Sequence, residues 1–132
     1  MIYFLDANII SYIMRQVPSV ISRLQELIKN NADIRIPIIS YYEVKRGLLS
    51  NNSIHKLALF DAQMKVFGLV PMKESTFELA AQIYAQLKSA GKLIEDADLF
   101  IGCSALEHNA ILLTNNSNHL ERIPHLQIEV LK

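Results

Sequence analysis

The chain has 132 residues, 51% of them hydrophobic and 20% charged, and its 13 basic and 13 acidic side chains leave no formal net charge. This length predicts one domain over residues 1–132, and no stretch approaches the roughly 18 consecutive apolar residues of a membrane span. The zero net charge excludes a general attraction to nucleic acids, while the lone Cys103 and the absence of a basic, cleavable leader predict a protein of the reducing cytoplasm.

Short apolar runs alternate with stretches of helical periodicity along the chain. In chain order, the predicted elements are a strand (2–5), helices (9–15 and 18–28), a strand (35–39), helices (40–49 and 54–66), a strand (69–72), helices (75–88 and 97–107) and two strands (110–113 and 126–130). Ser40 and Ser75 are expected to be helix N-caps, and Gly91 lies where a helix should stop.

This order of elements predicts an α/β fold. The strands are almost continuously apolar, which is typical of a parallel sheet that helices cover on both faces. We therefore expect three layers, in which a central, mainly parallel sheet of about five strands is flanked by helices. In such sheets, ligands bind beyond the carboxyl ends of the strands.

Polar residues stand at this edge of the predicted sheet. Asp6 comes directly after the first strand, Glu43 lies one helical turn after the second, and Asn115 and Asn116 follow the fourth. Asp98 belongs to the first turn of the helix that leads into the fourth strand, so it can face the same edge. The fold therefore predicts that these side chains converge.

Each of these residues also has an ordinary structural explanation. Asp6 can cap the helix that follows it, and Ser40 and Glu43 fit the S-x-x-E capping box. The helix macrodipole favours acidic residues in a first turn, and asparagines are common in turns. The acidic residues concerned are Glu95, Asp96 and Asp98.

Taken together, the carboxylates favour a metal site. Like charges at close range repel each other, and no lysine or arginine adjoins Asp6 or Asp98 in the sequence to relieve this. A divalent cation bound between the carboxylates would relieve this repulsion. Mg²⁺ and Mn²⁺ prefer hard oxygen ligands, usually one or two carboxylates completed by water or phosphate oxygens.

Four segments resemble the PIN-domain nucleases and, more narrowly, the VapC-type toxins of bacterial toxin–antitoxin pairs. They are LDAN at 5–8, YEV at 42–44 with Gly47, GKLIEDADLFIGCSA at 91–105, and LTNN at 113–116 followed by ERIP at 121–124. The resemblance covers essentially the whole chain in the right order. The chain departs from the family pattern at Leu120, where an aromatic is usual, and in its final IEVLK, which lacks a frequent tryptophan.

The resemblance implies a PIN-like fold and a Mg²⁺- or Mn²⁺-dependent endoribonuclease. The family's acidic quartet falls on Asp6, Glu43, Asp98 and, at its variable last position, Asn116. The three carboxylates would hold the metal, directly or through water, and a water activated there would attack the phosphodiester. Four further residues are expected to orient the metal-holding side chains without binding the metal themselves: Asn8, Thr114, Asn115 and Asp96. Between the two neighbouring aspartates we favour Asp98 as the ligand, because it takes the family position.

The resemblance also implies partners. The family usually cuts structured RNA, so transfer RNA is the expected substrate class, and a VapB-like antitoxin and a homodimer are expected as protein partners. Scattered basic residues can form a positive rim for RNA or simply a solvated surface: Lys45, Arg46, Lys65, Lys73, Lys88, Lys92 and Arg122. The four histidines, at 55, 108, 119 and 125, have no metal-ligand spacing and are interpreted as surface or loop residues.

Two alternatives come from other functional classes. A phosphoryl-accepting receiver domain would need an acidic pair after its first strand and an aspartate after its third, where this chain has Lys73. A catalytically silent PIN-like module that only binds RNA or protein stays open, because Asn116 adds no negative charge to the quartet.

Overall fold

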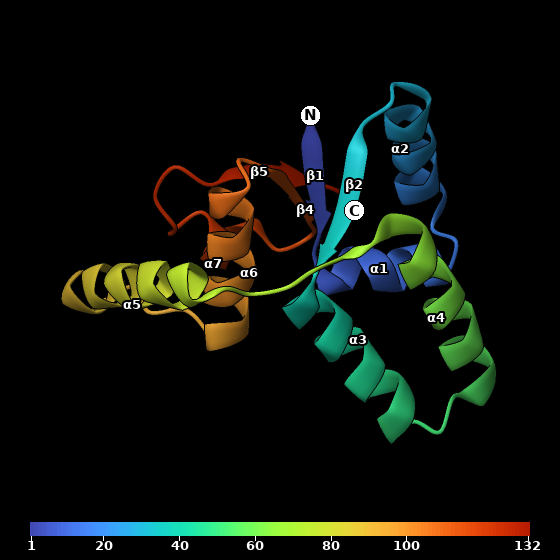
Figure 1. Ribbon diagram of the computed structural model, residues 1–132, viewed down its shortest axis with the longest axis horizontal. Helices are drawn as coiled ribbons and strands as arrows, with labels where there is room; N and C mark the ends of the chain where they lie inside the picture. Colours follow the sequence, from blue (N-terminus) through green and yellow to red (C-terminus); the bar gives the residue numbers. More distant parts are fainter.

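Five parallel strands form the middle layer of the computed structural model, which describes residues 1–132 (Figure 1). The strand order is β3-β2-β1-β4-β5, and every neighbouring pair is parallel. The strands span Ile2–Leu5 (β1), Asp33–Pro37 (β2), Leu69–Val70 (β3), Ile111–Thr114 (β4) and Gln127–Val130 (β5). This confirms the expected α/β fold.

Helices cover both faces of this sheet. They span Ala7–Met14 (α1), Pro18–Lys29 (α2), Ile38–Ser50 (α3), Ile54–Phe67 (α4), Glu74–Ser89 (α5), Asp96–Glu107 (α6) and Ser117–Leu120 (α7). Helices α1, α2 and α4 lie on one side of the strands and α5 and α6 on the other, while α3 descends from the end of β2 (Figure 1). No helix is both long and apolar enough to span a membrane.

The two faces of β1 belong to two different cores, because successive side chains of a strand point in opposite directions. Tyr3 and Leu5 pack with the apolar faces of α1, α2 and α4, where Phe60 is fully buried. Phe4 points the other way and packs with α5 and α6, together with Leu112 of β4. The strand that carries Asp6 at its end is therefore held from both sides.

The second strand lies two residues earlier than expected. It ends at Pro37, which has extended dihedral angles and acts as the N-cap of α3, so that Ile38 and Ile39 belong to the helix. The apolar run at 35–39 thus crosses from strand to helix, which periodicity alone does not reveal. The expected Ser40 cap is wrong, because Ser40 lies inside α3, fully buried, with no hydrogen-bond partner for its hydroxyl.

Smaller differences occur at other boundaries. Lys73, not Ser75, is the N-cap of α5, and the backbone N–H of Lys73 donates to the hydroxyl of Thr76. Strand β3 stops at Val70, directly before Pro71, which has no N–H for a sheet hydrogen bond. The short helix α7 is not predicted by the sequence, because four residues are too few to show helical periodicity.

The chain changes direction between β1 and β4. After β1 it passes by way of α1 and α2 to β2 on one side, and after β4 it passes to β5 on the other. In an open parallel sheet, this switch point opens a crevice beyond the carboxyl ends of the two strands. Asp6 and Asn115 follow directly on β1 and β4, so both lie at this crevice.

Candidate active site

Asp6 is held in a buried and hydrogen-bonded position at the end of β1. Asp6 is only 4% exposed to solvent. Oδ1 accepts a hydrogen bond from the backbone N–H of Ala7 at 2.8 Å, so Asp6 does cap α1. Oδ2 accepts from the amide of Asn8 at 3.1 Å and from the hydroxyl of Thr114 at 2.7 Å. Burial raises the pKa of Asp6, although each of these three donors lowers it.

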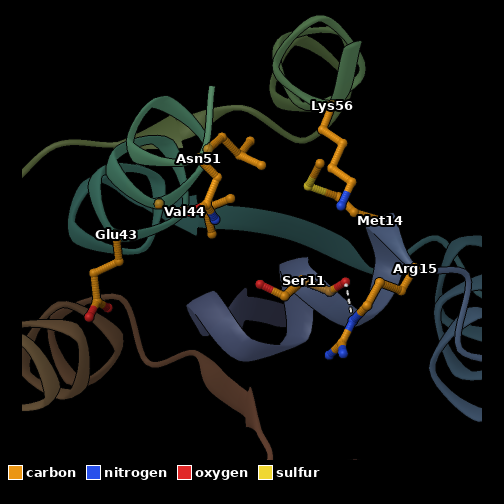
Figure 2. Close-up of a pocket in the computed structure, with 9 residues that line it drawn as sticks. Ser11, Met14, Arg15, Glu43, Val44, Asn51 and Lys56 are labelled. Atoms are coloured by element: carbon orange, nitrogen blue, oxygen red, sulfur yellow. Dashed lines mark hydrogen bonds between the residues drawn. The ribbon is translucent and has the colours of Figure 1, made fainter. Parts of the chain in front are cut away.

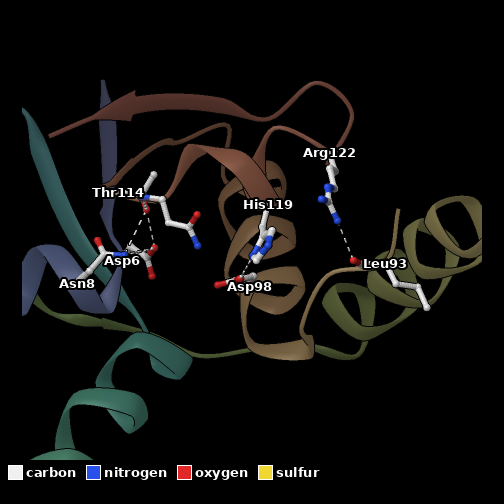
Figure 3. Close-up of polar contacts among 8 residues, drawn as sticks. Asp6, Asn8, Leu93, Asp98, Thr114, His119 and Arg122 are labelled. Atoms are coloured by element: carbon white, nitrogen blue, oxygen red, sulfur yellow. Dashed lines mark hydrogen bonds and ion pairs between the residues drawn. The ribbon is translucent and has the colours of Figure 1, made fainter. Parts of the chain in front are cut away.

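Thr114 and Asn8 join the ends of β1 and β4 around this carboxylate. The hydroxyl of Thr114 donates to Asp6 and accepts from the backbone N–H of Asn116 at 3.0 Å. The side-chain oxygen of Asn8 accepts from the backbone N–H of Asn115 at 3.0 Å. Figure 3 shows Asn8, Asp6 and Thr114 grouped at the ends of the two strands. Two residues expected to support the site therefore contact Asp6 directly.

Asp98 reaches the same place from α6, where it lies in the first turn. Its side chain extends toward Asp6 (Figure 3), and Nδ1 of His119 lies 3.7 Å from its Oδ2. Burial and the negative charge of Asp6 raise the pKa of Asp98, while His119 lowers it. The His119 side chain is 45% exposed, as expected of a surface residue, but α7 also brings this ring against a site carboxylate, a contact that the sequence did not predict.

Glu43 comes from the second turn of α3 and is half-buried. Burial raises its pKa, and the charges of Asp6 and Asp98 raise it further, whereas Arg46 opposes them. Nη2 of Arg46 lies 3.9 Å from Oε2 of Glu43. Because α3 begins at Ile38, Glu43 is too far from the helix start to complete a capping box. Helix capping therefore does not explain Glu43.

An open cleft of about 390 Å³ begins at Glu43 and runs between α1, α3 and α4. Glu43 lies at one end of this cleft and Lys56 at the other, with Ser11 and Arg15 of the α1 segment along the wall (Figure 2). The carboxylate of Glu43 points away from Lys56 (Figure 2). The negative charge of Glu43 therefore interacts with the charges of Asp6 and Asp98 rather than with the cations of the cleft.

Asp6, Glu43 and Asp98 thus form one electrostatic unit, which we call the acidic edge. They come from β1, α3 and α6, and the charge of Asp6 acts on both of the others. Glu95, the N-cap of α6, adds a further negative charge that raises the pKa of Glu43 and Asp98. Sequence reasoning noticed Glu95 only as a helix-end residue, although its place beside Asp98 could have indicated this.

The remaining predicted residues lie around the acidic edge in different ways. Asn116 is the N-cap residue of α7 and binds Thr114 through its backbone. The side chain of Asn115 instead donates to the hydroxyl of Tyr12 at 2.7 Å, which ties β4 to α1. Asp96 is exposed and borders a shallow pocket with Phe77 and Tyr84 of α5. A supporting role for Asp96 stays a prediction.

The donors of the acidic edge suit a hard divalent cation. Carboxylate oxygens are the ligands that Mg²⁺ and Mn²⁺ prefer, and burial together with mutual repulsion makes these three costly to ionise without a cation. The side chains do not form a closed ligand cage, because no group of three histidine, cysteine, aspartate or glutamate side chains has metal-binding spacing. A site that completes its ligand set with water and phosphate oxygens matches the chemistry of these donors.

Comparisons of sequence and structure match nearly the whole chain to known proteins. Residues 3–126 match the PIN domain family. The chain is 33% identical over 132 residues to Ribonuclease VapC1 of Haemophilus influenzae strain R2866, with 96% of each chain covered. It superposes on a chain of VapBC2 from Rickettsia felis, bound to a DNA fragment from their promoter, with a TM-score of 0.92, 28% identity and complete coverage of both chains. For VapBC-1 from nontypeable Haemophilus influenzae the TM-score is 0.87, at 29% identity and 98% coverage of each chain.

Proposed function

Because this chain belongs to the PIN-domain family, and within it to the VapC ribonucleases, we propose that it is a Mg²⁺- or Mn²⁺-dependent endoribonuclease that acts as the toxin of a toxin–antitoxin pair. The observation that carries the proposal is the acidic edge. Three carboxylates from separate elements act on one another's ionisation at the switch point of the sheet, where an α/β fold binds its ligands.

Asp6, Glu43 and Asp98 would hold the metal, directly or through water. When bound, the ion supplies Lewis acidity, which activates a water and neutralises charge on the phosphate. Thr114 and Asn8 fix the orientation of the Asp6 carboxylate through their hydrogen bonds. Asn116 borders the site next to Thr114, and its amide is assigned to orienting a water in place of a fourth carboxylate.

The proposed substrate is structured RNA, with transfer RNA as the class to test first. The zero net charge of the chain favours recognition by shape and by a small local positive surface over strong sequence-independent binding. Arg46 is the cation nearest to the acidic edge along α3, and it is exposed.

A VapB-like antitoxin is the proposed protein partner. Both of the solved structures compared above are VapBC assemblies, and the one from Rickettsia felis is bound to a DNA fragment from their promoter. A basic side chain of such a partner would be attracted to the negative charge of the acidic edge, where it would relieve the repulsion among the three carboxylates. We further propose that the toxin forms homodimers and acts in the cytoplasm.

One observation supports a second candidate, a silent PIN-like module that binds RNA without cutting it. At the last position of the quartet, Asn116 is an amide, so the metal site has one negative charge fewer than a site with four carboxylates. Such a module would still bind RNA but would give no cleavage products in any metal.

The deciding experiment is incubation of the purified, partner-free protein with total cellular transfer RNA in Mn²⁺ or Mg²⁺, and then in EDTA. Discrete fragments that require the metal and disappear in Asp6→Asn are the expected result. Asp33→Asn is the matched control, because Asp33 is an aspartate at the opposite end of the sheet, where it pairs with Arg35. Equal cleavage by Asp6→Asn and the wild type would refute the proposed site.

A further inference from the structure

An exposed aromatic–cation pair stands beside the acidic edge, on α3. Tyr42 directly precedes Glu43 and is 54% exposed. The guanidinium carbon of Arg46 lies 5.1 Å from the centroid of the Tyr42 ring, and Nη2 of Arg46 lies 3.9 Å from Oε2 of Glu43. Residues three and four positions apart are neighbours on a helix surface. One guanidinium therefore adjoins both the Tyr42 ring and a carboxylate of the acidic edge.

The fold does not account for this pair. The preceding residue, Tyr41, is half-buried, and its ring stacks on Phe60 with 5.6 Å between centroids. Tyr41 thus contributes to the core that covers β1. Tyr42 packs in neither core, and an exposed aromatic ring gains little from the hydrophobic effect where it stands.

The surroundings of Tyr42 select the chemistry of a ligand. A purely apolar partner would meet the charges of Glu43 and Arg46 at the border of the ring. A nucleotide offers both features that the pair can bind, a flat base for the ring and a phosphate for the guanidinium. Unpaired RNA bases stack on aromatic side chains and on arginine planes, and arginine binds phosphate with two parallel hydrogen bonds.

We propose that Tyr42 and Arg46 form a subsite for one unpaired nucleotide of the RNA, next to the phosphate that the acidic edge would hold. The base stacks on Tyr42, and Arg46 turns from Glu43 to the neighbouring phosphate. This inference rests on the proposed function for the place of the scissile phosphate, but the stacking itself requires only that the chain binds RNA.

The test measures binding in EDTA, where metal-dependent cleavage does not interfere. A fluorescein-labelled oligoadenylate is titrated with the wild type, Tyr42→Phe, Tyr42→Leu and Tyr84→Leu, and fluorescence anisotropy is recorded. Tyr84 is the matched control, since it is a tyrosine of α5 that is 39% exposed. Tyr42→Leu is expected to weaken binding about 5- to 150-fold, the range for one stacked base, while Tyr42→Phe and Tyr84→Leu stay close to the wild type.

Arg46 gives a second, independent measurement. Arg46→Gln should weaken binding and reduce its dependence on salt, because one phosphate contact fewer releases fewer counterions. Equal affinities of the wild type and Tyr42→Leu, or equal losses in Tyr42→Leu and Tyr84→Leu, overturn the proposal. So does a Tyr42→Leu variant that changes only its sedimentation behaviour, because the ring would then be a contact between protein chains.

The outcome is separable from that of the proposed function. If the wild type gives no metal-dependent cleavage of transfer RNA, the ribonuclease proposal fails, yet a loss of oligoadenylate binding in Tyr42→Leu still identifies the stacking subsite. If the wild type cleaves transfer RNA and Tyr42→Leu binds normally, the subsite fails and the ribonuclease proposal stands.

Discussion

The hydroxyl of Thr114 donates a 2.7 Å hydrogen bond to the carboxylate of Asp6, and Thr114 is fully shielded from solvent. This contact joins the ends of β1 and β4 where the carboxylates converge. The same hydroxyl accepts the backbone N–H of Asn116, so it also holds the start of α7. Replacing one oxygen atom therefore tests both the stability of the sheet end and the orientation of Asp6.

Thr114→Val is expected to destabilise the protein by about 1–3 kcal/mol, because it leaves a buried carboxylate oxygen with one donor fewer. Urea unfolding measures this loss. Thr114→Ser keeps the hydroxyl and should retain most of the stability. The affinity for Mn²⁺ should also fall about 10- to 100-fold in Thr114→Val, as for residues that orient metal ligands. Equal stability of the Val and Ser variants would contradict the assigned hydrogen bond.

Glu43→Gln is expected to make the metal-free protein more stable at neutral pH. The pKa of Glu43 is raised in the folded protein above the ordinary value of 4.5. Between that value and the raised pKa the folded state binds more protons than the unfolded chain, so wild-type stability falls as the pH increases through this window. Glutamine has no proton to lose. The advantage of Glu43→Gln should therefore appear as the pH rises above about 4.5 and then stay constant.

Urea unfolding of both proteins in EDTA, from about pH 4 to about pH 8, measures this difference. Comparing the wild type with the variant cancels carboxylates that do not interact with Glu43, such as Asp33 and Glu107, whose pKa values are lowered. A constant difference across the whole range would mean that the environment of Glu43 is not the cause.

Mn²⁺ is expected to raise the melting temperature of the wild type. A ligand at ~100 times its Kd stabilises the folded state by about 2.7 kcal/mol, and the ion additionally removes the repulsion within the acidic edge. Asp98→Asn should lose most of this rise, while Asp33→Asn should keep it. Differential scanning calorimetry with and without Mn²⁺ gives the comparison, and an unchanged rise in Asp98→Asn would exclude Asp98 as a ligand.

His119→Gln is expected to shift the acidic limb of the pH–rate profile to higher pH. His119 lowers the pKa of Asp98, so its removal lets that pKa rise, and a higher pH is then needed to ionise the ligand. Initial rates of RNA cleavage across the acidic range measure the shift. His55→Gln, at an exposed residue of α4, is the control. Superimposable profiles for His119→Gln and the wild type would count against the contact.

Arg23→Gln is expected to lower stability by about 1 kcal/mol without affecting cleavage. Nε and Nη2 of Arg23 donate to the two carboxylate oxygens of Glu129 at 2.7 and 2.9 Å, which ties α2 to β5, the edge strand two places from β1. A double-mutant cycle with Glu129→Gln isolates the energy of the pair. A loss of activity at full stability would link β5 to the site in a way that these contacts do not explain.

Much of the fold is predictable from the sequence because strands buried on both faces are almost continuously apolar. That holds for Ile2–Leu5, whose predicted and observed bounds agree. It fails at Pro37, where an apolar run continues from a strand into a helix and only the tertiary structure sets the boundary. Caps were harder still, since Ser40 and Ser75 have the chemistry of a cap but not the position.

The candidate site is predictable where a residue directly follows a strand. Asp6 and Asn115 could be placed at the sheet edge in this way, Glu43 and Asp98 could be placed there from their helical turns, and the family resemblance implied their roles as metal ligands. His119 could not be found, because its contact depends on a four-residue helix that folds back onto α6. The hydrogen bond from the Asn115 side chain to Tyr12 could not be predicted either, because only the packing of α1 against β4 brings the two side chains together.

The order of the strands has a consequence for synthesis. Asp6 and Thr114 are 108 positions apart along the chain, although they touch in the folded protein. A chain that has left the ribosome only as far as α5 already contains Asp6, Glu43 and β2, but neither Asp98 nor β4, which pairs with the other edge of β1. Contacts between such distant parts of a chain form late, because the intervening segment must first be brought to order. The carboxylates of the acidic edge therefore come together only once nearly all of the chain has been made.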